Sequence, residues 1–158
     1  MPILRDIMRK QRMDYFIRYI GENDKILEIG SGDSWFKDFL YKSGRRNYLS
    51  IDIENESADI MGDILLWREL GLAANSFDVI VAFEVVEHVD CFEACFDLLK
   101  KNGRLLLTTP VPHMDWILRI MEAAGLNQKR TSPHNHLVYL KNAPGTWAEK
   151  KLMTGGGG

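Results

Sequence analysis

Apolar residues follow two patterns along this chain, and the two patterns alternate. Runs rich in apolar residues predict five buried strands, at residues 25–29, 47–52, 58–61, 78–83 and 104–109. The segments between these runs carry apolar residues at every third or fourth position, which predicts helices with one buried face. Strands that alternate with helices indicate βαβ units, and therefore a parallel sheet with helices on its faces.

Five helices are predicted from the apolar stripes and from the residues that can start or end them. They lie within residues 1–20, 33–44, 64–70, 92–103 and 114–125. Asp33 or Ser34 can cap the second helix, and Gly44 suits the position that ends it. Asn102 and Gly103 are expected to end the fourth helix.

These elements predict one domain over the 158 residues, which is enough chain for a sizeable core. We expect an α/β, Rossmann-like three-layer sandwich with a mostly parallel sheet. Residues 1–20 form its N-terminal helix and residues 25–125 its core. The pattern weakens from residue 126, and residues 137–140 fit a strand or a helix.

Composition excludes several classes of protein. The chain is 46% hydrophobic and 27% charged, which is unlike a disordered or fibrous protein. Its net charge of −2 gives no electrostatic reason to expect a nucleic-acid partner. The basic residues near the start are interpreted as a solvated helix face. They are Arg9, Lys10, Arg12 and Arg18.

Location is predicted from what the sequence does not contain. No apolar run approaches the roughly 18 residues of a membrane span, and the first residues contain no apolar signal-peptide region. Cys91 and Cys95 are predicted to be small core residues. We therefore expect a cytoplasmic protein without a membrane partner.

The most informative motif is a glycine turn that follows the first strand. It reads Glu28-Ile29-Gly30-Ser31-Gly32, and a helix follows it. Glycine permits the backbone angles of such a turn and lets a ligand approach closely. Asp52 ends the next strand 22 positions after Gly30, near the spacing of about 20 expected for a carboxylate that binds ribose hydroxyls. Together these features predict a nucleotide site.

The identity of the nucleotide depends on one helix position. A dinucleotide fingerprint needs a small residue where this chain has Trp35, which disfavours NAD or FAD. S-adenosylmethionine (SAM) has no pyrophosphate but carries an ammonium group. Glu28, beside the turn, is a plausible direct or water-mediated partner for that ammonium.

With these motifs, residues 25–113 resemble the class I SAM-dependent methyltransferases, particularly the small-molecule group with the pattern Glu-x-Gly-x-Gly. The resemblance implies that SAM binds here and leaves as S-adenosylhomocysteine. It places Asp52 on the ribose, Ile53 against the adenine, and Asp63 with Ile64 near the adenine amino group. The full set of implied cofactor residues is Glu28, Gly30, Ser31, Gly32, Asp52, Ile53, Asp63, Ile64 and Phe83.

The same resemblance places the acceptor near the end of the fourth strand. Residues 83–89 resemble a family segment often written Leu-Glu-His, where Phe83 contributes mainly backbone contacts. His88 and His113 are candidate bases, because imidazole titrates near neutral pH. Each could instead be a hydrogen-bonded structural histidine. His134 and His136 lack a clear third ligand, so no metal is expected.

The C-terminal region departs from the family, whose sheet has seven strands in the order 3-2-1-4-5-7-6. Only 33 residues follow Gly125, so the strand hairpin at residues 126–158 is expected to be incomplete. The fifth strand would then be an exposed edge through which the domain could form a homodimer.

Function has one preferred interpretation and three alternatives. Transfer of a methyl group from SAM to a small-molecule acceptor is preferred. A non-catalytic SAM-binding module would keep the same motifs, since fold does not determine activity. Trp35 disfavours an NAD-dependent oxidoreductase. A nucleic-acid or protein methyltransferase is disfavoured because no basic, aromatic surface or Asn-Pro-Pro-Tyr motif is evident.

Overall fold

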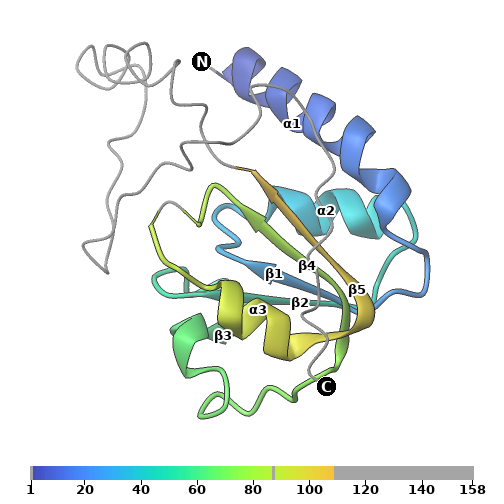
Figure 1. The fold of residues 1–158 in the computed structure, drawn as a ribbon. Helices are drawn as coiled ribbons and strands as arrows, with labels where there is room; N and C mark the ends of the chain where they lie inside the picture. Colours follow the sequence, from blue (N-terminus) through green and yellow to red (C-terminus); the bar gives the residue numbers. More distant parts are fainter. Residues whose placement is uncertain (1, 87, 109–158) are drawn as a thin grey trace.

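The centre of the molecule is one parallel sheet, seen in a computed structural model that describes residues 2–86 and 88–108. Within them the strand order is β3-β2-β1-β4-β5 (Figure 1). The strands are β1 (Ile26–Ile29), β2 (Tyr48–Asp52), β3 (Ile60–Met61), β4 (Phe77–Phe83) and β5 (Leu99–Thr108). The predicted parallel sheet and the first five positions of its order are confirmed.

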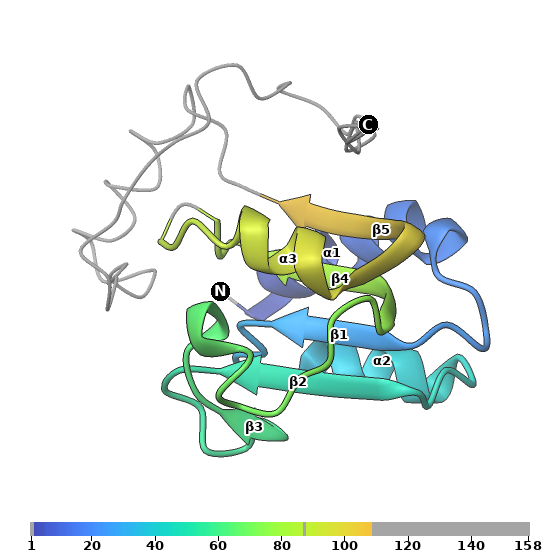
Figure 2. The same cartoon turned by 60° about the horizontal axis from the view of Figure 1, so that its bottom comes forward.

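Helices cover both faces of this sheet, as predicted. The helices are α1 (Pro2–Phe16), η1 (Ile17–Tyr19), α2 (Trp35–Lys42), η2 (Ile64–Leu66) and α3 (Phe92–Leu98). α1 and α2 lie on one face, and α3 and η2 lie on the other (Figure 2). The described residues therefore form a three-layer sandwich, which confirms the expected fold class.

Each face of the sheet has its own hydrophobic core, because successive strand residues point to opposite sides. Ile26 belongs to the core beneath α1 and α2, whereas Leu27 belongs to the core beneath α3. All four residues of β1 are buried. This explains why the first strand reads as a continuous apolar run that is interrupted only by Glu28.

Several predicted boundaries are wrong. The helix expected at residues 64–70 is only the short 3-10 helix η2. α3 ends at Leu98, and β5 starts at Leu99 rather than at residue 104. Leu99 pairs with Phe77 ahead of an irregularity in the ladder, and Asn102 in that irregularity has a φ of 65°. The Asn-Gly pair therefore marks a bulge in the strand rather than the end of the helix.

The ends of α2 follow one prediction and correct another. Gly44, with a φ of 83°, follows the last turn, and its N–H donates to the Tyr41 carbonyl at 3.1 Å. Ser34 does stand at the N-cap, but its side chain makes no capping bond. The Asp33 carboxylate binds Arg9 of α1 instead of capping α2.

The remaining predictions about the chain fall outside the described residues. They concern the helix at residues 114–125, strands six and seven, and the shortened hairpin at residues 126–158. In the part that the structure describes, no helix is long and apolar enough to cross a bilayer.

Candidate functional site

The glycine turn leaves the carboxyl end of β1 with two glycines in left-handed conformation. Gly30 has a φ of 75°, and its N–H donates to the Ile51 carbonyl at 2.8 Å. A methyl group at Gly30 would lie 2.6 Å from Cγ2 of Val85. Gly32 has a φ of 52°, and no atom lies within 4 Å of the position that its Cβ would occupy. One glycine is therefore packed, and the other faces open space that a ligand could fill.

Substituting each glycine by alanine separates these two situations. Gly30→Ala is expected to lower the free energy of unfolding by about 2 kcal/mol, because it adds a close contact to the cost of a positive φ. Gly32→Ala should cost only about 1 kcal/mol, from the φ alone. Urea denaturation measures both values. Equal losses would show that Val85 moves aside without cost.

Asp52, at the end of β2, lies directly beside this turn. Its Oδ2 accepts a hydrogen bond from the Gly32 N–H at 3.2 Å. Its Oδ1 accepts from the N–H groups of Glu54 at 2.9 Å and Asn55 at 3.0 Å. The structure thus brings the predicted acid and the predicted glycine turn together, through a carboxylate that also shapes the following loop.

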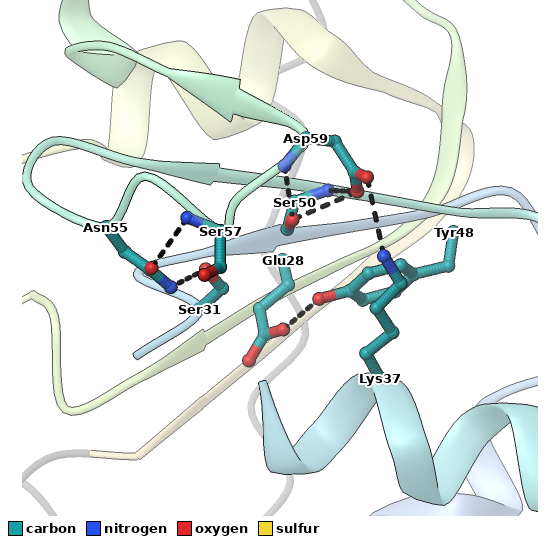
Figure 3. Close-up of polar contacts among 8 residues, drawn as sticks. All are labelled: Glu28, Ser31, Lys37, Tyr48, Ser50, Asn55, Ser57 and Asp59. Atoms are coloured by element: carbon teal, nitrogen blue, oxygen red, sulfur yellow. Dashed lines mark hydrogen bonds and ion pairs between the residues drawn. The ribbon is translucent and has the colours of Figure 1, made fainter. Parts of the chain in front are cut away.

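Asn55 is a residue that the sequence analysis missed. Its side-chain amide donates to Ser31 Oγ at 3.3 Å and to the Gly32 carbonyl. Its Oδ1 accepts from the Ser57 N–H at 2.9 Å (Figure 3). The available signal was an asparagine in a polar turn, since asparagine side chains commonly bond the backbone two residues on. Asn55 fastens the loop after β2 to the glycine turn.

The three predicted adenine contacts are placed differently from one another. Ile53 follows Asp52 with 40% of its surface exposed, so an apolar side chain is available at the crevice. Asp63 caps η2 by accepting a hydrogen bond from the Leu65 N–H at 2.9 Å. Ile64 is buried in the core beneath α3. Its side chain is therefore a core residue, and only its backbone could face a ligand.

Glu28 is a buried carboxyl group beneath the turn. It is 2% exposed, and Oε2 accepts a hydrogen bond from the Tyr48 hydroxyl (Figure 3). Burial raises the pKa of Glu28 to about 8, against the opposing effect of the Tyr48 hydrogen bond, and the charges of Asp52 and Asp33 raise it further. Burial, followed by the charge of Glu28, also raises the pKa of Tyr48 above its usual value.

A second polar group lies beside Glu28 and Tyr48. Asp59 accepts hydrogen bonds from the Ser50 N–H at 2.8 Å and the Ser50 hydroxyl at 2.9 Å, and Lys37 Nζ lies 3.5 Å from its carboxylate (Figure 3). Burial opposes the ionisation of Asp59, but the Ser50 hydrogen bonds and Lys37 outweigh it and lower its pKa. Lys37 is thus already engaged by a carboxylate.

Phe83, the last residue of β4, lies in an aromatic cluster under α1. Its ring centroid is 5.5 Å from Phe16, 6.0 Å from Trp35 and 5.4 Å from Phe36. The Trp35 and Phe83 rings are nearly parallel, at 19°. Because the Phe83 side chain is buried in this cluster, it is the Phe83 backbone that remains for contacts at the strand end.

The solvated basic face predicted for α1 is wrong for two of its residues. Arg9 binds Asp33 at 2.6 Å, and its guanidinium lies 5.0 Å from the Trp35 ring centre. Arg12 binds Glu84 at 2.7 Å and lies 4.9 Å from the Phe83 ring centre. The sequence signal was their helical spacing, which puts both near the face that carries the buried Met13 and Phe16. α1 is therefore tied to the residues that follow β1 and β4.

The segment after β4 bends sharply toward α1. Glu84 has a φ of 57°, and its N–H continues the ladder to the Thr108 carbonyl at 2.9 Å. His88 is half-buried in the turn that follows, and its N–H donates to the Val85 carbonyl at 2.8 Å. His113, the other candidate base, lies outside the described residues.

The carboxyl ends of β1, β2 and β4 lie at one edge of the sheet, which is where Rossmann-like proteins bind nucleotides in a crevice. The glycine turn is joined there to Asp52, and Ile53 is exposed beside them. The chain belongs to the methyltransferase-domain family, because the family's sequence model matches residues 5–142. No curated protein matches the chain closely enough to add a more specific assignment.

Three solved structures resemble this chain, and the first of them shows the same fold. A SAM-dependent methyltransferase from Archaeoglobus fulgidus superposes with a TM-score of 0.61 at 20% identity, covering 80% of this chain and 62% of that protein. A SAM-dependent methyltransferase from Mesorhizobium loti has a TM-score of 0.49 at 19% identity, covering 63% and 53%. The MycE methyltransferase of mycinamycin biosynthesis, solved with Mg and S-adenosylhomocysteine, has a TM-score of 0.45 at 17% identity, covering 85% and 41%. This chain thus spans about two fifths to three fifths of these proteins' lengths.

Proposed function

We propose that this chain binds SAM in the crevice at the carboxyl ends of β1, β2 and β4 and transfers its methyl group to a small-molecule acceptor. The observation that carries the proposal is the junction of Gly32 and Asp52. There an acidic strand end lies 3.2 Å from a glycine whose Cβ position is open. A nucleoside needs both features, because its ribose hydroxyls require acceptors and its approach requires space.

Each part of the cofactor has a candidate partner on this chain. The Asp52 carboxylate accepts from the ribose hydroxyls, and Ile53 packs against the adenine. Asp63 and the backbone of Ile64 would contact the adenine amino group. Glu28 and the backbone of the turn, including Gly30 and Ser31, would contact the amino-acid moiety. Phe83 contributes its backbone.

Trp35 supports SAM over a dinucleotide. In dinucleotide-binding proteins a small residue at this helix position lets helix and strand pack closely around a pyrophosphate. Here the position begins α2 with an indole that stacks on Phe83 and lies under Arg9. The large Trp35 side chain, packed in the aromatic cluster, thus occupies the position where a dinucleotide fingerprint requires a small residue.

When bound, SAM supplies an electrophilic methyl carbon on its sulfonium. The chain's contribution is to hold that carbon in line with the acceptor, and positioning of this kind supplies effective molarities on the order of 10⁵ to 10⁸ M. His88 lies in the turn after β4, and its proposed role is to accept a proton from a hydroxyl or ammonium acceptor.

Calorimetry with SAM, S-adenosylhomocysteine and NADH tests the cofactor assignment. We expect binding of the first two at micromolar concentration and none of the third. S-adenosylhomocysteine release during incubation with a panel of small hydroxyl, amine and carbon acceptors then tests transfer. Binding of SAM without transfer to any acceptor would favour the non-catalytic SAM-binding module. Binding of NADH alone would overturn the assignment of SAM as the cofactor.

Replacement of His88 by asparagine tests the proposed base. Once an acceptor is found, we expect turnover to fall about a hundredfold, which is typical for loss of a general base, while the Kd for SAM changes less than about twofold. Rates of S-adenosylhomocysteine formation and calorimetry measure the two effects. A parallel loss of both would assign His88 a structural or cofactor role.

A further inference from the structure

The proposed function assigns Glu28 to the amino-acid moiety of the cofactor, but it makes no use of the hydrogen bond from Tyr48 or of the proton on Glu28. Glu28 is on β1 and Tyr48 on β2, and both side chains lie on the sheet face that α2 covers (Figure 3). A carboxyl group that is 2% exposed is costly to ionise unless a cation or several donors stabilise its charge. The donor that the structure gives this carboxyl is one phenol.

The charged groups around the pair come from five segments. The turn after β1 contributes Asp33, β2 contributes Asp52, and the segment before β3 contributes Asp59. α2 contributes Lys37, whose Nζ is 5.8 Å from the Tyr48 ring centre but is bound to Asp59. α1 contributes Arg9 and Arg5, whose guanidinium groups lie 2.6 Å and 3.9 Å from the Asp33 carboxylate. The cations near the pair are therefore committed to other carboxylates.

Two of these carboxylates act directly on Glu28. The charges of Asp52 and Asp33 oppose a negative charge on it, in the same direction as its burial. The net result is a pKa for Glu28 of about 8, so the free protein near neutral pH holds a protonated carboxyl beneath the glycine turn. A positive charge that entered the crevice would reverse this balance.

We propose that Glu28, held in place by Tyr48, gives up its proton when the ammonium group of the cofactor's amino-acid moiety binds, so that cofactor binding and proton release are coupled. This inference rests on the proposed function. The carboxyl O–H bond breaks, the proton passes to solvent, and the carboxylate stays on Glu28 as the partner of the ammonium. Tyr48 is a positioning residue, because its hydroxyl bonds Glu28 rather than the cofactor.

The coupling predicts a particular pH dependence. A ligand that prefers the ionised form of Glu28 binds more tightly as pH rises toward about 8, and its affinity then levels off. We expect the ratio of wild-type to Glu28→Gln affinity for SAM to rise about 25-fold between about pH 6.5 and pH 8.5, in proportion to the ionised fraction of Glu28. The ratio cancels any titration of the ligand's own amino group.

Titration calorimetry at about pH 7, in phosphate and in imidazole buffer, measures the protons released. With wild-type protein we expect about one proton released for SAM and for S-adenosylhomocysteine. 5′-Methylthioadenosine keeps the nucleoside but lacks the ammonium, so it should release almost none. Glu28→Gln should bind SAM with almost no proton release. Tyr48→Phe removes a bond that lowers the pKa of Glu28, so its affinity profile should level off at a higher pH.

The outcomes separate this inference from the proposed function. If SAM bound without proton release, and the ratio of wild-type to Glu28→Gln affinity did not change with pH, the inference would be overturned and the proposed function would remain. Equal proton release by SAM and 5′-methylthioadenosine would also overturn it. Absence of SAM binding to the folded wild-type chain at every pH would overturn both. Circular dichroism of each variant confirms that the comparison is made between folded proteins.

Discussion

Asp52→Ala is expected to weaken SAM binding about a hundredfold. The carboxylate is proposed to accept two ribose hydroxyls, and hydrogen bonds to a charged acceptor contribute roughly 1.5–3 kcal/mol each. A hundredfold change corresponds to about 2.7 kcal/mol, which is close to the lower end of the roughly 3–6 kcal/mol expected for two such bonds. Isothermal calorimetry with SAM measures the effect.

Two matched variants separate ribose binding from loop support. Asp52 also accepts bonds from the N–H groups of Glu54 and Asn55, so alanine could weaken binding by loosening the loop. Asp52→Asn keeps one acceptor oxygen for those groups but loses the charge. Asp59→Asn disturbs the opposite end of the same loop, where Ser50 is bound, without touching the proposed ribose position. We expect Asp52→Asn to weaken SAM binding tenfold or more, because the hydrogen bonds to the ribose would no longer be charge-assisted. Comparable losses from Asp59→Asn would mean that Asp52 acts through the loop.

Glu28→Gln is expected to stabilise the fold at alkaline pH. In the folded protein the pKa of Glu28 is about 8, against an ordinary value of 4.5, so the folded state holds a proton that the unfolded state releases. The free energy of unfolding from this group therefore falls as pH rises from about 5 to about 8. Glutamine is neutral, has nearly the same shape, and can still accept the Tyr48 hydroxyl. The free energy of unfolding of the variant should equal that of wild type near pH 5 and exceed it by roughly 3 kcal/mol near pH 8.

Urea denaturation across this pH range measures the difference. Glu69→Gln provides the matched control, because Glu69 is exposed and distant from the pair in sequence. The free energy of unfolding of Glu69→Gln should have the same pH dependence as that of wild type. If Glu28→Gln also had the wild-type pH dependence, or were less stable than wild type near pH 8, the buried carboxyl would have to be ionised in the folded protein.

The fold could be predicted because its information is local. The period of apolar residues defines strands and helices, and the alternation of the two leads to a parallel sheet. The glycine turn was also readable, because a positive φ at Gly30 and Gly32 excludes most other residues. Boundaries were less certain, because the early start of β5 depends on the pairing of Leu99 with Phe77, which no local pattern records.

Long-range side-chain partners could not be predicted. Arg9 and Arg12 meet carboxylates that lie 24 and 72 positions away, so their spacing on a helix indicates a shared face but not a partner. Tyr48 reaches Glu28 only because the register of β1 and β2 puts both side chains on one face. Ile64 was predicted to contact the cofactor because of its neighbours in the sequence. In the structure its side chain is part of the hydrophobic core instead.

The central position of β1 has a consequence for synthesis of the chain. β1 pairs with β2 on one side and with β4 on the other, and its partner for Ile26 on the second side is Val79, 53 positions later. Until β4 has left the ribosome, one edge of β1 has no native neighbour, and parallel pairing over such distances is slow. Nascent chains that stop short of residue 77 should therefore be bound by chaperones, whereas chains that extend past β4 can complete the centre of the sheet.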